Sequence, residues 1–199
     1  MGKSNTRKES FSASSLGNWF RDKRPLLLFV AGFTLFLLAF YAFYYSFFFR
    51  ENWAGPLFEA QAWMTGQLLQ LLGLEVSVGG AIISHPDLSV RYFYGCEGLE
   101  IMALFGAAIL FFPIAFRYKW PGLILGGLAL VALNQLRVVV LFIIGLYSRE
   151  AFEFMHLYGG FALFTLCGIF LWILWLEWAT RQKRKREKTN GEKAGKIPA

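Results

Sequence analysis

The sequence contains no internal repeat, no Gly-rich phosphate loop and no cluster of residues at metal-ligand spacing. We therefore expect neither a repeat architecture nor a phosphate-loop enzyme, and we expect no metal and no cofactor. Charge is also scarce, because Asp, Glu, Lys and Arg make up 17% of the chain, whereas hydrophobic residues make up 56%. The 22 Phe among 199 residues exceed what a soluble domain needs. This composition indicates an all-α polytopic membrane protein.

Four apolar stretches are long enough to cross a bilayer, whose hydrocarbon core of about 30 Å requires about 20 helical residues. They comprise residues 26–49, 99–116, 122–147 and 157–178. The first is too long for the apolar part of a cleavable signal peptide, and no small-residue cleavage site follows it. The chain thus divides into an N-terminal tail (1–25), a membrane-embedded domain (26–178) and a basic C-terminal tail (179–199). We expect disorder over residues 1–18 and from about residue 181 onward.

The basic residues predict how these spans are oriented. With the N-terminus inside, the cytoplasmic segments carry 16 Lys and Arg, the external segments carry 3, and Arg137 is the twentieth. This asymmetry follows the positive-inside rule and places both termini in the cytoplasm. The net charge of +7 then reflects topology and attraction to anionic membrane lipids, and we expect no nucleic-acid partner.

Two external features are expected between the first and second spans. Residues 56–72 are apolar but carry one Glu and three Gln, which favours an interfacial helix on the outer surface. If this segment crossed the membrane instead, every later segment would invert. Residues 76–78 and 88–94 alternate between apolar and polar on either side of a turn at residues 84–87, which predicts a short β-hairpin. Because β-structure cannot lie open in lipid, the hairpin must sit above the bilayer.

Arg137 lies inside the third apolar stretch, where a charge costs roughly 2.5–3.5 kcal/mol. Such a residue indicates a functional site whose partners come from neighbouring spans. Cys96 and His156 lie at the outer starts of the second and fourth predicted spans. Arg137 is roughly 16 Å from the outer end of its own span, and its long side chain can reach outward. A thiol, an imidazole and a guanidinium at one depth predict cysteine chemistry at a membrane surface.

Ordinary structural roles are the alternative for each residue. Cys96 taken alone would be a small buried hydrophobe, and His156 an interfacial or capping histidine. Arg137 taken alone would form an ion pair with Glu100 or Glu153. The coincidence of all three at one depth favours the functional interpretation.

The surrounding residues add two candidates with supporting roles. Asn134 precedes Arg137 by three residues and makes that helix face polar, and Glu100 follows Cys96 by four residues. Cys167 lies mid-span, about 16 Å deeper than His156, so a disulfide to Cys96 is implausible. Cys96 is then a free thiol facing an oxidising compartment, which favours a chemical role.

Three motifs resemble the exosortase/archaeosortase family of membrane cysteine transpeptidases. They are CEGL at the head of one span, NQLR within the next and a His at the head of the last, and they cover about residues 70–178 with matching order and spacing. The short chain and the Glu that follows CEGL, Glu100, resemble the compact form called exosortase H. The resemblance implies exported substrates that carry a C-terminal recognition motif, a transmembrane helix and a basic cluster. It also implies a bacterial inner membrane, an unknown acceptor nucleophile and catalytic roles for Cys96, Arg137 and His156.

The chemistry also follows from the residue types. A cation adjacent to a thiol lowers its pKa, so we expect Arg137 to favour the Cys96 thiolate and to stabilise the oxyanion. The resemblance implies that Arg137 donates a proton, but a guanidinium donates hydrogen bonds far more readily, and His156 suits proton transfer better. Two other functions remain open. One is a non-enzymatic channel or transporter subunit with a path lined by Arg137 and His156, and the other is a protease that only hydrolyses.

Overall fold

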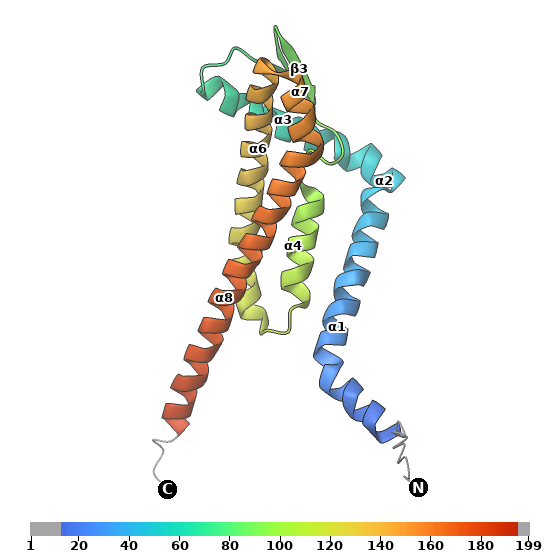
Figure 1. The fold of residues 1–199 in the computed structure, drawn as a ribbon, viewed down its shortest axis with the longest axis vertical. Coiled ribbons are helices and arrows are strands. Elements are labelled where there is room, and N and C mark those ends of the chain that lie inside the picture. Colours follow the sequence, from blue (N-terminus) through green and yellow to red (C-terminus); the bar gives the residue numbers. More distant parts are fainter. Residues whose placement is uncertain (1–12, 195–199) are drawn as a thin grey trace, which may run out of the picture.

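The computed structural model describes residues 13–194, with side chains from residue 21 to residue 190. Four helices, α1, α4, α6 and α8, run roughly along one axis, while α3 and a small sheet lie across one end (Figure 1). The start of α1 and the end of α8 lie at the opposite end (Figure 1). The elements in chain order are α1 Ala13–Tyr44, α2 Phe47–Phe49, η1 Arg50–Ala54, α3 Gly55–Leu71, β1 Ser77–Gly79, β2 Ile82–His85, β3 Leu88–Arg91, α4 Leu99–Phe111, η2 Phe116–Tyr118, α5 Lys119–Pro121, η3 Gly122–Gly126, α6 Gly127–Tyr147, α7 Arg149–Phe154, η4 Met155–Gly159 and α8 Gly160–Ala194.

Three helices in the described part of the chain are long and apolar enough to cross a membrane. They are Arg21–Tyr44, Phe116–Tyr147 and Arg149–Asn190, and each of the last two runs through several consecutive elements. The second predicted span, residues 99–116, corresponds to α4, which is apolar but has only 13 residues, about 20 Å of helix. The chain is therefore a helical membrane protein, and a count of four spans stays a prediction.

The β-structure has three strands where the sequence predicted two. β1 pairs antiparallel with β2, and β2 with β3, so that Val78 faces Ile83 and Ile83 faces Val90. The missed turn lies between β1 and β2, where Gly80 has a φ of +59°. Glycine adopts that left-handed conformation without steric cost, so the Gly79–Gly80 pair was a turn signal that the hairpin prediction overlooked.

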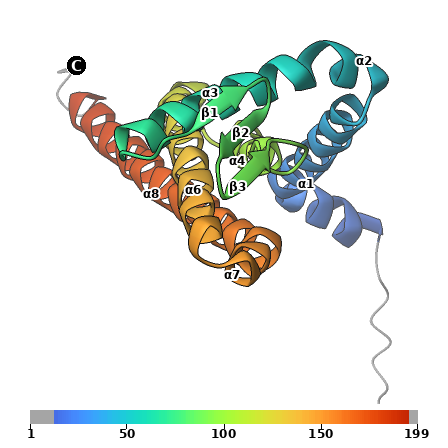
Figure 2. The ribbon, with the colours of Figure 1, turned by 90° about the horizontal axis from the view of Figure 1, so that it is seen from above.

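Helix α3 packs its small side chains against the sheet and α6. Its buried residues, Ala62, Thr65, Gly66 and Leu69, recur at helical spacing and form one face. A Cβ on Gly66 would lie 2.3 Å from Val78 Cγ2, so only glycine lets β1 approach this closely. Seen from above, α3 runs past α6 beside the sheet, and α7 lies on the far side of α6 (Figure 2).

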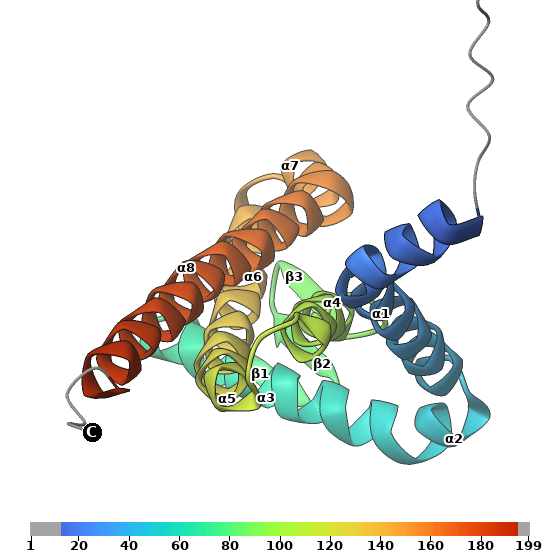
Figure 3. The same cartoon turned by 90° about the horizontal axis from the view of Figure 1, so that it is seen from below.

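The lower part of the bundle is an apolar core between α4, the start of the α6 helix and α8. Phe105 of α4 fills the space beside Gly126, where a Cβ would lie 2.2 Å from its ring. Helix α1 packs mainly on α4, through rings such as Phe36 on Phe111, and viewed from below it stands apart from α8 (Figure 3). The bundle is thus a three-helix unit with α1 attached along α4.

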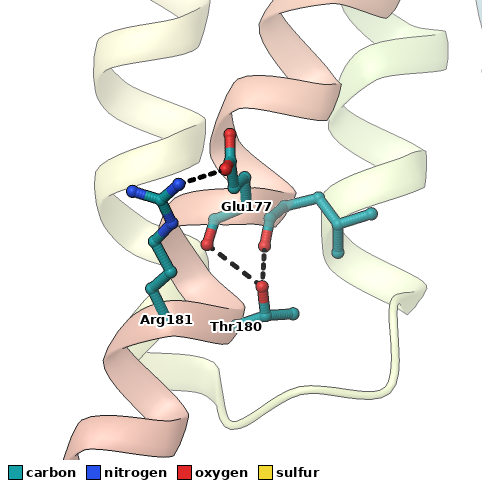
Figure 4. Close-up of polar contacts among 4 residues, drawn as sticks. Glu177, Thr180 and Arg181 are labelled. Carbon is teal, nitrogen blue, oxygen red and sulfur yellow. Dashed lines mark hydrogen bonds and ion pairs between the residues drawn. The ribbon is translucent and has the colours of Figure 1, made fainter.

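The C-terminal segment corrects one expectation. Helix α8 continues to Ala194 and helix α1 begins at Ala13, so the predicted disorder is wrong for residues 181–194 and 13–18. Residues 1–12 and 195–199 lie outside the described part. Ion pairs at i,i+4 spacing support the helix, including Glu177 with Arg181 and Lys183 with Glu187. Thr180 Oγ1 also donates to the Leu176 and Glu177 carbonyls at 2.8 and 3.0 Å (Figure 4).

Candidate functional site

Cys96, Arg137 and His156 line one small cavity of about 20 Å³ at the end of the bundle that the sheet covers. They come from three parts of the chain: the turn before α4, the middle of α6, and η4. We call this space the Cys96 cavity. Its other walls are Val90, Arg91, Tyr92, Val138, Leu141, Phe142 and Phe152. The structure thus brings together the three residues that the sequence placed at one depth.

The turn that carries Cys96 is held by glycine geometry. Gly98 has a φ of +75°, and a Cβ there would lie 3.0 Å from the Asn134 side chain and 3.0 Å from the Phe164 ring. Only glycine satisfies both the left-handed conformation and the close approach. Helix α4 begins after this turn, at Leu99, so Cys96 does not lie on the helix itself.

The Cys96 thiol is buried, with 7% of its surface exposed. Burial raises the pKa of the Cys96 thiol above its ordinary value, while the Phe93 backbone and the Arg137 guanidinium act in the opposite direction. The guanidinium thus acts in the expected direction, but desolvation of the thiolate outweighs it, so the pKa of the thiol is raised overall. The resting thiol is protonated, and its reaction requires a group that accepts the proton.

Arg137 is held by one side-chain hydrogen bond and by close packing. Its Nη1 donates to Asn134 Oδ1 at 3.3 Å, and its Cζ lies 5.8 Å from the centre of the Phe164 ring. Its Nε is buried and has no hydrogen-bond partner among the described residues. A Cβ on Gly160 would lie 3.1 Å from this Nε, so glycine lets the guanidinium lie against α8. No ion pair within residues 21–190 includes Arg137, and Glu153 pairs with Arg149 instead.

His156 lies in a π-helical turn of the continuous helix formed by α7, η4 and α8. Such turns often occur at functional sites, because the extra residue redirects a side chain. The imidazole stacks on Phe152 with centroids 5.6 Å apart and an interplanar angle of 3°, and it also meets Phe93 at 6.0 Å. These rings hold the imidazole at the cavity wall.

Of the two candidates for supporting roles, Asn134 hydrogen-bonds to residues of the site, whereas Glu100 bonds to Tyr45 outside it. Asn134 is buried, and its Nδ2 donates to the Cys96 carbonyl at 3.0 Å while its Oδ1 accepts from Arg137. One amide therefore joins the thiol-bearing turn to the guanidinium. Glu100 accepts from the Tyr45 hydroxyl at 3.3 Å, at the end of α1, and does not line the Cys96 cavity.

Residues 23–186 match the family model described as Transmembrane exosortase (Exosortase_EpsH). The chain belongs to the transmembrane exosortase family. This membership indicates a membrane enzyme of the transpeptidase type in general terms. The matched region contains all three residues of the Cys96 cavity. No curated protein and no solved structure matches the chain.

The second cysteine of this exosortase lies in a different space. Cys167 lines a cavity of about 160 Å³ between α6 and α8, which we call the Cys167 cavity. Arg137 lines this cavity as well, so Cys167 is less isolated from polar groups than its mid-span position suggested. The two thiols lie in separate cavities on either side of the guanidinium.

Sequence reasoning missed several polar residues around the Cys96 turn. Gln61 and Thr65 of α3 belong to this group, and their i,i+4 spacing was a signal that they share one face. Glu97, the residue after Cys96, was not a candidate either, yet it is fully buried, and Tyr44 Oη donates to its Oε1. Burial raises the pKa of Glu97 to about 7. Its second oxygen has no hydrogen-bond partner among the described residues.

Proposed function

We propose that the chain is a membrane cysteine transpeptidase that cleaves C-terminal sorting signals of exported proteins and transfers the new C-terminus to an acceptor. The observation that carries the proposal is the convergence of Cys96, Arg137 and His156 on one cavity from three elements. Family membership supports the transpeptidase class, and Cys96 is a free thiol in this structure.

The proposed reaction assigns one role to each of the three residues. His156 takes the proton from Cys96 Sγ, because burial leaves the resting thiol protonated. The thiolate attacks the scissile carbonyl, and Arg137 donates hydrogen bonds to the oxyanion that forms. When the C–N bond breaks, the leaving amine takes the proton from His156, and an acyl-thioester on Cys96 remains. An amine acceptor, or water, then attacks this thioester and releases the thiol.

The proposed setting is the inner membrane of a bacterium, with both termini cytoplasmic and the site near the external face. The start of α1 and the end of α8 lie at the end of the bundle away from the Cys96 cavity, which supports this orientation (Figure 1). The proposed substrates carry a recognition motif, a transmembrane helix and a basic cluster, so that the cleavage point reaches the outer end of the bundle.

The test compares the two cysteines. Cys96→Ala should abolish cleavage of a tagged sorting-signal substrate in membranes, because it removes the nucleophile, whereas Cys167→Ala should leave cleavage largely intact. The measurement is the cleaved fraction over time at equal amounts of inserted enzyme, with trapping of the acyl-enzyme by mass spectrometry. Normal cleavage by Cys96→Ala would reject the proposal. Loss of cleavage in Cys167→Ala alone would move the nucleophile to the other cavity.

A further inference from the structure

The Cys96 turn is joined to α3 by a partly buried series of hydrogen bonds that the proposed reaction does not use. Gln61 of α3 lies at its centre: its Nε2 donates to the Glu97 carbonyl at 3.1 Å, and its Oε1 accepts from Asn134 Nδ2 at 3.2 Å. Gln135 Nε2 also donates to Gln61 Oε1, at 3.4 Å. One side chain of an external helix therefore contacts both the turn and the polar face of α6.

The direction of each hydrogen bond in this series follows from which of the two atoms carries a proton to donate. Thr65 Oγ1 lies 2.5 Å from Gln135 Oε1, which can only accept, so Thr65 donates its single hydroxyl proton there. Tyr92 Oη lies 2.7 Å from Thr65 Oγ1, and Tyr92 must then be the donor in that contact. Donation runs from Tyr92 through Thr65, Gln135 and Gln61.

This directed chain ends on the peptide groups that carry the thiol. Gln61 donates to the Glu97 carbonyl, and Asn134 Nδ2 donates to the Cys96 carbonyl as well as to Gln61. Thr65, Asn134 and Gln135 are each no more than 3% exposed, so water cannot replace a lost partner easily. Aligned hydrogen bonds in a buried site strengthen one another.

We propose that Gln61 is a positioning residue that holds the Cys96 turn and the Asn134–Arg137 pair in register. The proposal rests on the proposed function, because it assigns Gln61 a role in the same reaction. Gln61 does not line the Cys96 cavity, so it acts through the turn and through Asn134. Helix α3 is then a support for the catalytic turn as well as an external cover.

The two cysteines provide a built-in test of this role. Gln61→Met keeps the side-chain length but removes every hydrogen bond, and Gln67→Met is a matched control, because Gln67 lies exposed on the same helix and bonds Gln70. Full-length protein in membranes is pulsed with iodoacetamide, and labelling of each cysteine is measured by mass spectrometry alongside substrate cleavage. For Gln61→Met, Cys96 labelling should rise several-fold, Cys167 labelling should stay constant, and cleavage should fall at least ~10-fold, mostly in kcat. Gln67→Met should match the wild type in all three measurements.

Two results would overturn the proposal. Unchanged Cys96 labelling with normal cleavage would show that the turn does not need Gln61. A rise in the labelling of both cysteines would show that Gln61 supports the whole fold and not the turn alone, provided that Gln61→Asn gives the same result. Gln61→Asn is the milder change, because it keeps an amide on a shorter side chain. The labelling does not depend on catalysis, so it still reports on the turn if Cys96→Ala retains cleavage and the proposed function fails.

Discussion

Replacing Arg137 with Lys separates the shape of this cation from its charge. The guanidinium lines two cavities and donates through Nη1 to Asn134. A guanidinium presents several donors in a fixed plane, so it can bond Asn134 and still offer hydrogen bonds to an oxyanion in the Cys96 cavity. An ammonium at the end of a Lys side chain is a compact point charge and cannot bond both Asn134 and the oxyanion with the same geometry.

The expected loss is at least ~10²-fold in cleavage rate, the scale for removing one oxyanion donor. The structure supplies a second reason for a large effect. Arg137 has no ion pair within residues 21–190 and is half-buried beside apolar walls, which disfavours a localised charge. A Lys at this position would tend to lose its proton, whereas an Arg stays charged. Arg137→Gln should be no more active than the Lys variant.

The assay follows cleavage of a tagged sorting-signal substrate over time, normalised to the amount of inserted enzyme. Near wild-type cleavage by Arg137→Lys would refute the argument from shape, because charge alone would then suffice. If both Arg137 variants disappear from the membrane, Arg137 is structural, and the site must be rebuilt around Cys96 and His156.

Two further predictions concern residues of the CEGL motif. Because burial raises the pKa of Glu97 from 4.5 to about 7, the stability from its protonated form is fully present below pH 4.5 and is lost as pH rises to about 7. Glu97→Gln should remove this loss, about 3 kcal/mol in all, so its melting temperature in detergent should exceed that of wild type at pH 8 but not at pH 4.5. Parallel pH curves for the two proteins would contradict the assignment. Gly98→Ala should lower the free energy of unfolding by roughly 1–3 kcal/mol, because Ala is strained at this φ and its Cβ would press on Asn134 and Phe164. Both the melting temperature and the cleavage rate should therefore fall. An unchanged melting temperature would show that the turn relaxes freely.

Much of the site followed from the sequence because its depth is set by helix geometry. Counting about 1.5 Å per residue along each apolar stretch placed Cys96, Arg137 and His156 at one level, and they line one cavity. The protonated state of the thiol could not be predicted from the sequence, because it depends on how deeply the fold buries Cys96. The neighbouring cation taken alone predicts a lowered thiol pKa, whereas burial raises it.

The parts that sequence reasoning missed depend on which face of one element meets which face of another. The polar residues of the 56–72 segment indicated an interfacial helix, but hydropathy does not distinguish a polar residue facing water from one facing a buried amide. Gln61 and Thr65 face inward here, whereas Gln67 is exposed. Similarly, Glu97 next to Cys96 gave no hint that its carboxyl would face Tyr44 of α1, since that contact joins residues 53 positions apart.

The polar residues around Cys96 also explain how the end of the bundle next to the sheet acquires a unique arrangement. Helices in lipid gain little from burying apolar side chains against one another, so packing and interhelical hydrogen bonds decide their register. In this chain the buried amides of α6 are satisfied by α3 and by the Cys96 turn. If α3 were undocked, Asn134 and Gln135 would lose partners at a depth where water is scarce. Docking of α3 and assembly of the thiol–guanidinium site are therefore one structural event.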